Sequence, residues 1–332
     1  MKAFIVDEYG KHSRLRAGER PEPEVGDRDV LVRIHASGVN PLDSKIMAGE
    51  FKQLLPYKPP FVLGNDVAGV VERVGPGVRR FAAGDEVYAR PDAARIGTYA
   101  ELIAVDESDL ARKPAGLTMA EAASLPLVAL TAWQALVEKA NVQPGQKVLI
   151  HAGSGGVGTI AIQLAKHLGA HVATTTSAGN AGWVRELGAD QVVDYRGTDF
   201  ERVLDGFDVV LDSLGGQNLA KSLRVLRRGG LAIGLAGPPD PDFATQLGKP
   251  LLRPVMALLS RKVRAAARRL GVRYSFLFMR ADGEQLRKIT GLVDAGVIRP
   301  VLDRVFDFDD TVAALDYTGS GRAKGKVVVT MT

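Results

Sequence analysis

The sequence predicts an α/β protein in which a β-rich domain is interrupted by a second domain built on a doubly wound parallel sheet. Residues 1–110 form short strand-like runs separated by Gly, Pro and Asp, whereas strands alternate with helices from Val148 onward. Near its end the chain returns to one helix followed by short strands. A length of 332 residues also favours two domains over a single core. We expect the β-rich domain to span 1–120 and 269–332, and the inserted domain to span 121–268.

Composition narrows the classes of protein to which this chain can belong. Hydrophobic residues make up 46% and charged residues 24%, and no run approaches the roughly 20 apolar residues of a membrane span. We expect no stable membrane insertion, and the strand-like, partly acidic start MKAFIVDEYG indicates the cytoplasm rather than export. Because the chain has no cysteine, disulfides, thiolate nucleophiles and cysteine-ligated metals are excluded. Its five histidines form no ligand pair, so we expect no metal site.

The β-rich character of the first domain rests on three strand-like runs, Val30–Ile34, Val67–Val71 and Glu86–Ala89. Turn signals at Gly75–Gly77 and Gly84–Asp85 separate them. Together they predict a β-rich, partly closed module.

The inserted domain begins near Thr118, which forms a predicted capping box with Glu121 at the start of an alanine-rich helix. Five strand-like runs then alternate with helices expected over 159–168, 181–187 and 219–226. The five runs are VLIHAG, HVATTT, QVVDY, DVVLDS and LAIGLAG. This alternation predicts a parallel sheet with helices on both faces.

A glycine-rich turn, His151–Gly158, follows the first of these strands and opens a helix. Gly153, Gly155 and Gly158 fit the pattern G-x-G-x-x-G. Such glycines permit a tight turn, the close approach of a pyrophosphate, and tight packing of the helix on the sheet. The helix N-terminus faces the anion. In this strand–turn–helix context the turn predicts a dinucleotide-binding domain of the Rossmann type rather than a plain glycine-rich loop.

The end of the second strand indicates which dinucleotide is bound. A preference for NAD requires an acidic residue there, which accepts from the ribose 2′-hydroxyl. This end instead reads Thr174–Ser177, and no acid occurs from His151 to Arg185. Hydroxyl and backbone N–H groups donate to a 2′-phosphate, which a carboxylate would repel. The sequence therefore favours NADP(H) over NAD(H).

Several ordered motifs give the chain a specific resemblance. They are Gly38–Asp43, Leu63–Gly69, Leu125–Leu127 with Leu130–Ala132, the glycine turn and Gly325–Val328. Over nearly its whole length the sequence resembles the quinone oxidoreductase and enone reductase branch of the medium-chain dehydrogenase/reductase superfamily. The resemblance implies a GroES-like β-rich catalytic domain, an inserted Rossmann domain, and NADPH-dependent reduction of a quinone or an α,β-unsaturated carbonyl.

Zinc alcohol dehydrogenases of the same superfamily share these motifs. At the positions of their catalytic zinc ligands, however, this chain has Asn40, Asn65-Asp66 and a residue near Leu127. Their four-cysteine lobe has no counterpart in Tyr88–Tyr99. Without such ligands no Lewis acid polarises a carbonyl. The resemblance therefore implies a zinc-independent enzyme whose acceptor is a small hydrophobic quinone or enone. Asp66 is expected to be a structural acceptor rather than a general acid.

The resemblance also assigns residues to the NADP(H) site. The residues that it implies for the pyrophosphate are Gly153, Ser154, Gly155, Gly156 and Val157. Those implied for the 2′-phosphate are Ser177, Tyr195 and Arg322. Those implied for the remainder of the cofactor are Asn40, Thr131, Ser213, Leu235, Ala236, Phe276 and Phe278. Structural alternatives stand beside some of these roles. They are a helix N-cap for Ser177, a rim position for Tyr195, and strand core for the two phenylalanines.

The oxyanion that develops on the acceptor needs a hydrogen-bond donor, and three side chains are candidates. They are Asn40, then Lys45, which matches a motif variant of alkenone reductases, and then Tyr57. The alternatives are a surface salt bridge of Lys45 with Asp43, a loop role for Tyr57, and solvent as the proton source. We expect the acceptor to lie among apolar residues, namely Phe51, Leu54, Leu55, Tyr57, Leu127 and Phe276.

Between Lys249 and Arg280 the sequence holds nine Lys/Arg and no Asp/Glu, with a helical core predicted over Leu258–Leu270. A solvated helix face is favoured over lining the pocket, attracting an acidic acceptor such as an acyl-coenzyme A, or contacting a membrane. No nucleic-acid partner is expected, because the segment lacks the interleaved aromatic residues of a single-strand binder.

Two other functions remain open. One is an enoyl-thioester reductase, and the other is a non-catalytic, crystallin-like NADPH-binding protein that binds nucleic acid through the basic segment. The resemblance also implies a homodimer, formed through the last edge strand of the inserted domain, which we identify as Leu231–Leu235.

Overall fold

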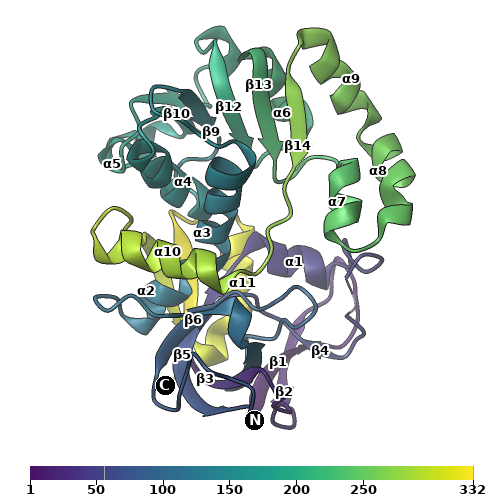
Figure 1. Cartoon of the computed structure of the whole chain (residues 1–332), viewed down its shortest axis with the longest axis vertical. Helices are drawn as coiled ribbons and strands as arrows, with labels where there is room; N and C mark the ends of the chain where they lie inside the picture. Colours follow the sequence, from purple (N-terminus) through teal and green to yellow (C-terminus); the bar gives the residue numbers. More distant parts are fainter. Residues whose placement is uncertain (56, 332) are drawn as a thin grey trace. The chain divides into compact units, whose positions relative to one another are not determined.

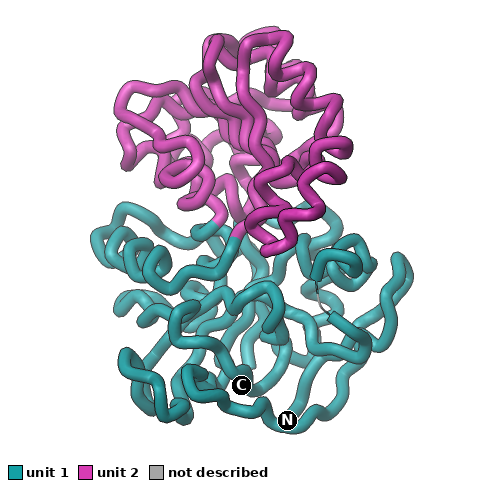
Figure 2. Tube along the Cα trace, turned by 45° about the vertical axis from the view of Figure 1, so that its right-hand side comes forward, with its two compact units in different colours: residues 1–130, 280–332 teal, residues 131–279 magenta. Residues whose placement is uncertain are grey.

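The computed structural model describes residues 1–55 and 57–331 and divides the chain into two compact units (Figure 2). Unit 1 contains residues 1–130 and 280–332, and unit 2 contains residues 131–279. One unit is therefore inserted into the chain of the other, as the sequence predicts. The chain passes between the units after residues 130 and 279, about ten residues later than the boundaries expected from the sequence. Within the described residues, no helix is long and apolar enough to cross a membrane.

Unit 1 is built on two sheets (Figure 1). The larger has the strand order β15-β16-β3-β5-β6-β8, with β7 also paired to β3, and the smaller has the order β2-β1-β4. The strands are β1 (Lys2–Val6), β2 (Leu15–Glu19), β3 (Asp29–Val39), β4 (Phe61–Val62), β5 (Val67–Val74), β6 (Glu86–Ala89), β7 (Leu102–Asp106), β8 (Leu110–Arg112), β15 (Leu302–Asp307) and β16 (Lys326–Thr330). The side chains of β3 alternate between two faces, because Val30, Val32 and Ile34 enter one buried cluster while Leu31 enters another.

The helices of unit 1 are short. They are α1 (Pro41–Met47), α2 (Met119–Ala123), α10 (Gly283–Asp294) and α11 (Thr311–Gly319), with 3-10 turns η1 (Glu107–Asp109) and η6 (Phe308–Asp310). The predicted capping box opens α2: Glu121 N–H donates to the Thr118 hydroxyl, and Thr118 N–H donates to the Glu121 carboxylate at 2.9 Å. The helix α3 (Pro126–Trp133) carries the chain from unit 1 into unit 2.

Unit 2 holds a six-stranded sheet in which all neighbouring strands are parallel. Its order is β11-β10-β9-β12-β13-β14. Numbered within the unit this is 3-2-1-4-5-6, which is the doubly wound order of a dinucleotide-binding sheet. The strands are β9 (Lys147–Ile150), β10 (His171–Thr176), β11 (Gln191–Asp194), β12 (Phe207–Asp212), β13 (Leu226–Gly234) and β14 (Arg273–Phe276). The Rossmann prediction is therefore confirmed.

The remaining elements of unit 2 connect these strands. They are η2 (Gln134–Lys139), α4 (Gly156–His167), η3 (Ala178–Asn180), α5 (Ala181–Glu186), η4 (Phe200–Arg202), α6 (Gly216–Arg224), α7 (Pro241–Gln246), η5 (Pro250–Leu252), α8 (Arg253–Leu259) and α9 (Arg261–Leu270). Because the strands are parallel, their carboxyl ends meet at one edge of the sheet, where such folds bind ligands.

Two expectations about unit 2 need correction. The segment Leu231–Leu235 is not at an edge, because β13 pairs with β12 on one side and with β14 on the other. The edge strand on this side is β14, whose apolar residues are too few to show as a strand in the sequence pattern. The helix predicted over Leu258–Leu270 is two helices. They meet at Ser260, whose buried hydroxyl donates to the Met256 carbonyl and competes with the helical backbone.

Candidate functional site

The glycine turn between β9 and α4 has the shape that a dinucleotide needs. A Cβ at Gly153 would overlap the Thr174 hydroxyl, and one at Gly158 would overlap the Ala152 carbonyl oxygen. At Gly155, by contrast, the nearest atom to such a Cβ is the Ala152 oxygen at 3.3 Å. Packing therefore requires glycine at the outer two positions. At Gly155 a Cβ would make only one tight contact, so the close approach of a pyrophosphate is the stronger reason for glycine there.

A chain of buried hydrogen bonds fixes the start of this turn. Ser222 Oγ donates to Asp212 Oδ2 at 2.8 Å, and His151 Nε2 lies 3.0 Å from Ser222 Oγ. On the other side of the ring, His151 Nδ1 lies 3.0 Å from Thr175 Oγ1, which accepts from Ala152 N–H at 3.2 Å. With the His151 proton on Nε2, every donor has an acceptor. Burial lowers the pKa of His151, so the ring stays neutral and the turn keeps its position.

The carboxyl ends of β10 and β11 carry the predicted 2′-phosphate contacts. The two strands pair in parallel with Thr176 beside Asp194, which brings Ser177 and the exposed Tyr195 to the same edge. Thr176 Oγ1 donates to Ser154 Oγ at 2.9 Å, so the glycine turn and the end of β10 are linked by hydroxyl groups. The segment 151–185 contains no acidic residue, and the carboxylate of Asp194, at the end of β11, accepts from Arg196 N–H at 3.0 Å.

Sequence reasoning missed Arg196. Its guanidinium lies over the ring of Tyr195, with 5.9 Å between the guanidinium carbon and the ring centroid. This places a cation directly beside the strand end at which a 2′-phosphate is expected. The signal in the sequence was its position next to Tyr195. Arg322, the predicted cation, belongs to unit 1 and remains a prediction.

The other predicted cofactor residues of unit 2 lie at or beyond the ends of the remaining strands. Ser213 follows β12, and Leu235 with Ala236 follows β13, where Leu235 N–H donates to the Asp212 carbonyl at 2.8 Å. Phe276 ends β14, and its ring packs edge-on against Phe243 with centroids 5.1 Å apart.

Phe276 is thus a buried core residue, and only its backbone remains as a candidate contact for the carboxamide. Phe278 lies 5.4 Å from the same Phe243 ring, and Thr131 is buried in α3. The cofactor roles of Phe278 and Thr131 remain predictions.

In unit 1, the positions that hold catalytic zinc in related dehydrogenases come together as a buried polar cluster. Asn40 Nδ2 donates to Asp66 Oδ2 at 2.9 Å, and Leu127 N–H donates to Asp66 Oδ1 at 2.7 Å. The cluster is closed by Lys326. Its ammonium donates to Asn40 Oδ1 at 2.6 Å, to Asp66 Oδ2 at 3.2 Å and to the Val39 carbonyl at 3.1 Å. This set of side chains does not suit zinc, because the Asn40 amide and the Asp66 carboxylate already bind the Lys326 ammonium.

The pairing of β3 with β16 explains how Lys326 arrives there. The strands run antiparallel with Val39 opposite Val327, so the end of β3 and the start of β16 meet. Asn40 follows the first of these residues and Lys326 precedes the second. Lys326 is 5% exposed, and all three of its ammonium protons have acceptors.

A second buried layer lies at the start of α1. Asp43 accepts from Asn40 N–H at 2.7 Å, from Asn65 Nδ2 at 2.6 Å and from the Tyr99 hydroxyl at 2.7 Å. Burial nevertheless raises the pKa of Asp43 to about 6, although these three donors oppose the shift. Asp43 therefore positions α1 and the Asn40 backbone. It makes no hydrogen bond or ion pair with Lys45, which was the alternative role for that lysine.

The three candidate donors differ in whether their side chains already donate hydrogen bonds within the protein. Both amide protons of Asn40 are engaged, by Asp66 and by the Gly38 carbonyl at 3.2 Å. The Tyr57 hydroxyl donates to the Ala93 carbonyl, and burial raises the pKa of Tyr57. The Lys45 ammonium makes no hydrogen bond or ion pair with other described residues.

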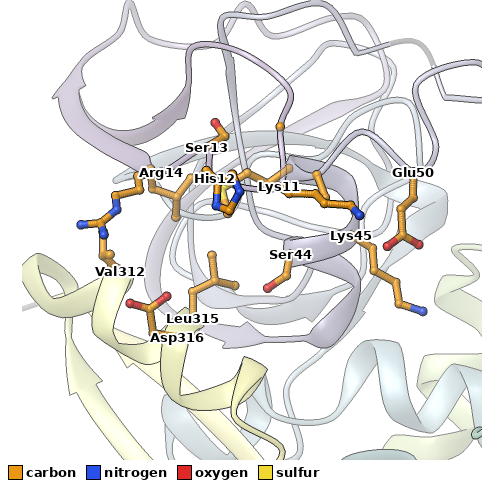
Figure 3. Close-up of a pocket in the computed structure, with 14 residues that line it drawn as sticks. Lys11, His12, Ser13, Arg14, Ser44, Lys45, Glu50, Val312, Leu315 and Asp316 are labelled. Carbon is orange, nitrogen blue, oxygen red and sulfur yellow. The ribbon is translucent and has the colours of Figure 1, made fainter.

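Lys45 lines a cavity of about 490 Å³ in unit 1 (Figure 3). The cavity lies between the turn at residues 10–15, the α1 segment and α11. In Figure 3 the side chains of Lys45 and Arg14 extend away from each other, toward opposite ends of the cavity. The apolar acceptor residues expected from the sequence do not line it, and their role remains a prediction.

Comparison with known proteins places this arrangement in context. An alcohol dehydrogenase GroES-like domain model matches residues 26–115, and a zinc-binding dehydrogenase model matches residues 187–329. Mitochondrial NAD(P)H oxidoreductase RTN4IP1 of Mus musculus is 35% identical, over 99% of this chain and 89% of its own. The 2-methylene-furan-3-one reductase of Solanum lycopersicum is 36% identical, over 99% and 79%. A solved quinone oxidoreductase from Coxiella burnetii is 30% identical with a TM-score of 0.85, covering 100% of this chain and 99% of that one.

Proposed function

Because the chain belongs to the zinc-independent quinone and enone reductase branch of the medium-chain dehydrogenase/reductase superfamily, we propose that it reduces a quinone or an α,β-unsaturated carbonyl with NADPH. The observation that carries the proposal is the polar cluster of unit 1. Asn40 and Asp66 stand at positions of the metal ligands of zinc alcohol dehydrogenases, and both accept from the Lys326 ammonium. Acceptors that take hydride without a Lewis acid are therefore favoured.

The cofactor preference follows from unit 2. A 2′-phosphate carries charge that a carboxylate at the end of β10 would repel, and the hydroxyls of Ser154, Thr176 and Ser177 stand there instead. Arg196 adds a positive charge beside Tyr195. These contacts support NADP(H) rather than NAD(H) as the cofactor, with the pyrophosphate over the glycine turn.

Bound NADPH supplies a hydride, which adds to the conjugated carbon of an enone or to a quinone while the electron pair moves to oxygen. The protein positions the acceptor and stabilises that oxygen. We assign this second task to Lys45, because its ammonium is not used elsewhere among the described residues, whereas Asn40 and Tyr57 already donate inside unit 1. The Lys45 ammonium donates one proton to the oxyanion left by hydride addition, and solvent then returns a proton to Lys45; for an enone, the resulting enol becomes the saturated ketone by exchanging this proton for one on carbon in solvent.

Oxidation of NADPH in the presence of 1,4-benzoquinone, a naphthoquinone, 3-buten-2-one and crotonyl-coenzyme A tests the activity. We expect turnover with the first three. Activity with crotonyl-coenzyme A alone would identify an enoyl-thioester reductase, and binding of NADPH without turnover of any acceptor would identify a non-catalytic protein. Lys45→Met should lower kcat with 3-buten-2-one by about 10²-fold while leaving NADPH binding unchanged. Lys52→Met, an exposed lysine of the following loop, is the matched control.

We further propose a homodimer joined through β14, since this strand presents the unpaired edge of the parallel sheet. Sedimentation velocity checks it, and Ser275→Pro should break the pairing because proline removes a backbone donor. The cytoplasm is our proposed location, although relatives include mitochondrial and chloroplastic proteins. Fractionation of cells that express the tagged full chain tests it.

A further inference from the structure

The exposed apolar side chains of the described residues are concentrated in one short stretch of unit 2. Of nine large apolar residues that are exposed, five lie between 251 and 270. They are Leu251 (91% exposed), Val255 (50%), Leu258 (68%), Leu259 (55%) and Leu270 (42%). The spacing of the first four is i, i+4, i+7 and i+8, so they share one face of the η5–α8 segment. That face is turned to solvent, whereas Met256 is buried on the other side. Apolar side chains therefore lie on both the buried and the exposed side of α8.

Cations accompany this apolar stripe. The helix α9 follows α8 directly and carries Arg261, Lys262, Arg264, Arg268 and Arg269. None of these five side chains makes a hydrogen bond or an ion pair with other described residues. No acidic residue occurs between 249 and 280, so the charge is not neutralised along the chain. Val263, Ala266 and Ala267 anchor α9 against the core of unit 2, which leaves the charged face outward.

Figure 1 shows α8 and α9 in succession beside the β14 end of the sheet, and we call residues 251–270 the basic-apolar surface. Its exposed apolar side chains and its cations together restrict which partner can cover it. Nucleic acid would satisfy the cations but leave the leucines in water. A second copy of the same surface would satisfy the leucines but would place two cationic helices against each other.

A bilayer with anionic headgroups satisfies both. The apolar side chains enter the boundary between headgroups and acyl chains, while the arginines and lysine meet the phosphates. The segment is too short to span a membrane, and none of the described helices is able to do so, which restricts contact to the surface.

We propose that the basic-apolar surface docks the protein peripherally on membranes that contain anionic phospholipid. This inference goes beyond the proposed reductase activity and does not depend on it. The sequence favours a solvated helix face for this segment. The side-chain exposures add that Leu258 and Leu259 of α8 are exposed together with Arg253, which composition does not indicate.

Sedimentation of the full chain with vesicles tests the proposal, using pure phosphatidylcholine and a 3:1 mixture of phosphatidylcholine with phosphatidylglycerol. We expect binding to the mixed vesicles, weaker binding in 0.5 M NaCl, and little binding to the neutral ones. Each basic residue near an anionic surface contributes about 1 kcal/mol, or roughly fivefold in partitioning. Arg261→Gln with Lys262→Gln should therefore weaken binding roughly 25-fold. Leu258→Ser with Leu259→Ser should weaken it by at least tenfold, on the order of the transfer free energy of one exposed leucine.

Matched controls lie elsewhere in unit 2. Lys147→Gln with Arg202→Gln removes the same charge from exposed positions, and Val203→Ser removes an apolar side chain that is 51% exposed. Both should bind vesicles as the wild type does, and every variant should keep the far-UV circular dichroism spectrum and the Tm of the wild type, which report folding independently of the proposed activity. The proposal fails if the wild type binds neither type of vesicle, or if the controls lose binding as much as the test variants. It also fails if Leu258→Ser with Leu259→Ser abolishes a dimer without altering vesicle binding, because a second copy would then cover the surface.

Discussion

Replacing Lys326 with methionine tests whether the cation at the centre of unit 1 stabilises the fold in the place where related enzymes hold a metal. Methionine has a similar length and no charge, so the change removes the ammonium with little loss of volume. It leaves the Asp66 carboxylate buried, with the Asn40 amide and the Leu127 N–H as its remaining donors.

The size of the effect follows from the geometry. At 3.2 Å and an effective dielectric constant of about 20, the attraction between the two charges is about 5 kcal/mol. Removing one partner of a buried pair generally costs about 3–5 kcal/mol, because the other charge stays uncompensated. We therefore expect the free energy of unfolding of unit 1 to fall by about 3–5 kcal/mol. Adding Asp66→Asn to the variant should recover at least 1 kcal/mol, since the uncompensated Asp66 charge is then removed as well.

Urea unfolding followed by far-UV circular dichroism measures this change over the whole chain. Both tryptophans, Trp133 and Trp183, lie in unit 2, so their fluorescence follows that unit separately. Lys324→Met, at an exposed position two residues earlier, is the control and should cost less than about 0.5 kcal/mol. A loss below about 1 kcal/mol for Lys326→Met, or a double variant less stable than the single one, would refute the reasoning.

Three further predictions concern the cofactor site and the pH dependence of stability. Gly155→Ala should weaken NADPH binding about tenfold, measured by fluorescence titration, with little change in Tm. Gly158→Ala should instead lower the free energy of unfolding by about 1–3 kcal/mol, because its Cβ overlaps the turn. Equal effects of the two variants on binding and on Tm would contradict this. Arg196→Gln should raise KM for NADPH about tenfold and leave KM for NADH unchanged, as expected for a charge-assisted contact with the 2′-phosphate; a parallel change in both constants would exclude that contact. Asp43 has a pKa of about 6 in the folded state against an ordinary value of 3.8, so the folded state binds the proton more tightly. Its contribution to stability is full below pH 3.8 and is lost as the pH rises through 6, a change of about 3 kcal/mol at 1.36 kcal/mol per pKa unit. Urea unfolding of wild type and Asp43→Asn between pH 4 and pH 7.5 should show this difference, and parallel pH profiles would disprove it.

The features that sequence reasoning predicted are those set by neighbouring residues. The glycine turn at His151–Gly158 is one, because strand, turn and helix are consecutive and each glycine has its own steric reason. The hydroxyl-rich end of β10 is another, since the residue after a strand lies at the edge of the sheet whatever the rest of the fold does. The alternation of strands and helices likewise predicted the doubly wound order of unit 2.

The features that it missed depend on residues far apart in the chain. Lys326 donates to Asn40 across 286 positions, and in the sequence it was only part of the Gly325–Val328 motif. Nothing local indicates that this lysine is buried. The identity of the edge strand was missed for a similar reason, because whether β13 or β14 is outermost depends on how the last strand pairs.

The sequence by itself determined the class of fold, the kind of cofactor site and the absence of cysteine ligands, because periodicity, spacing and composition are local properties of a chain. Only the tertiary structure decided that the vacant ligand positions are joined by a lysine, that Arg196 stands beside Tyr195, and that the leucines of α8 face outward. Burial and charge pairing are properties of the packed chain. They appear only when strands distant in sequence, such as β3 and β16, are hydrogen-bonded side by side.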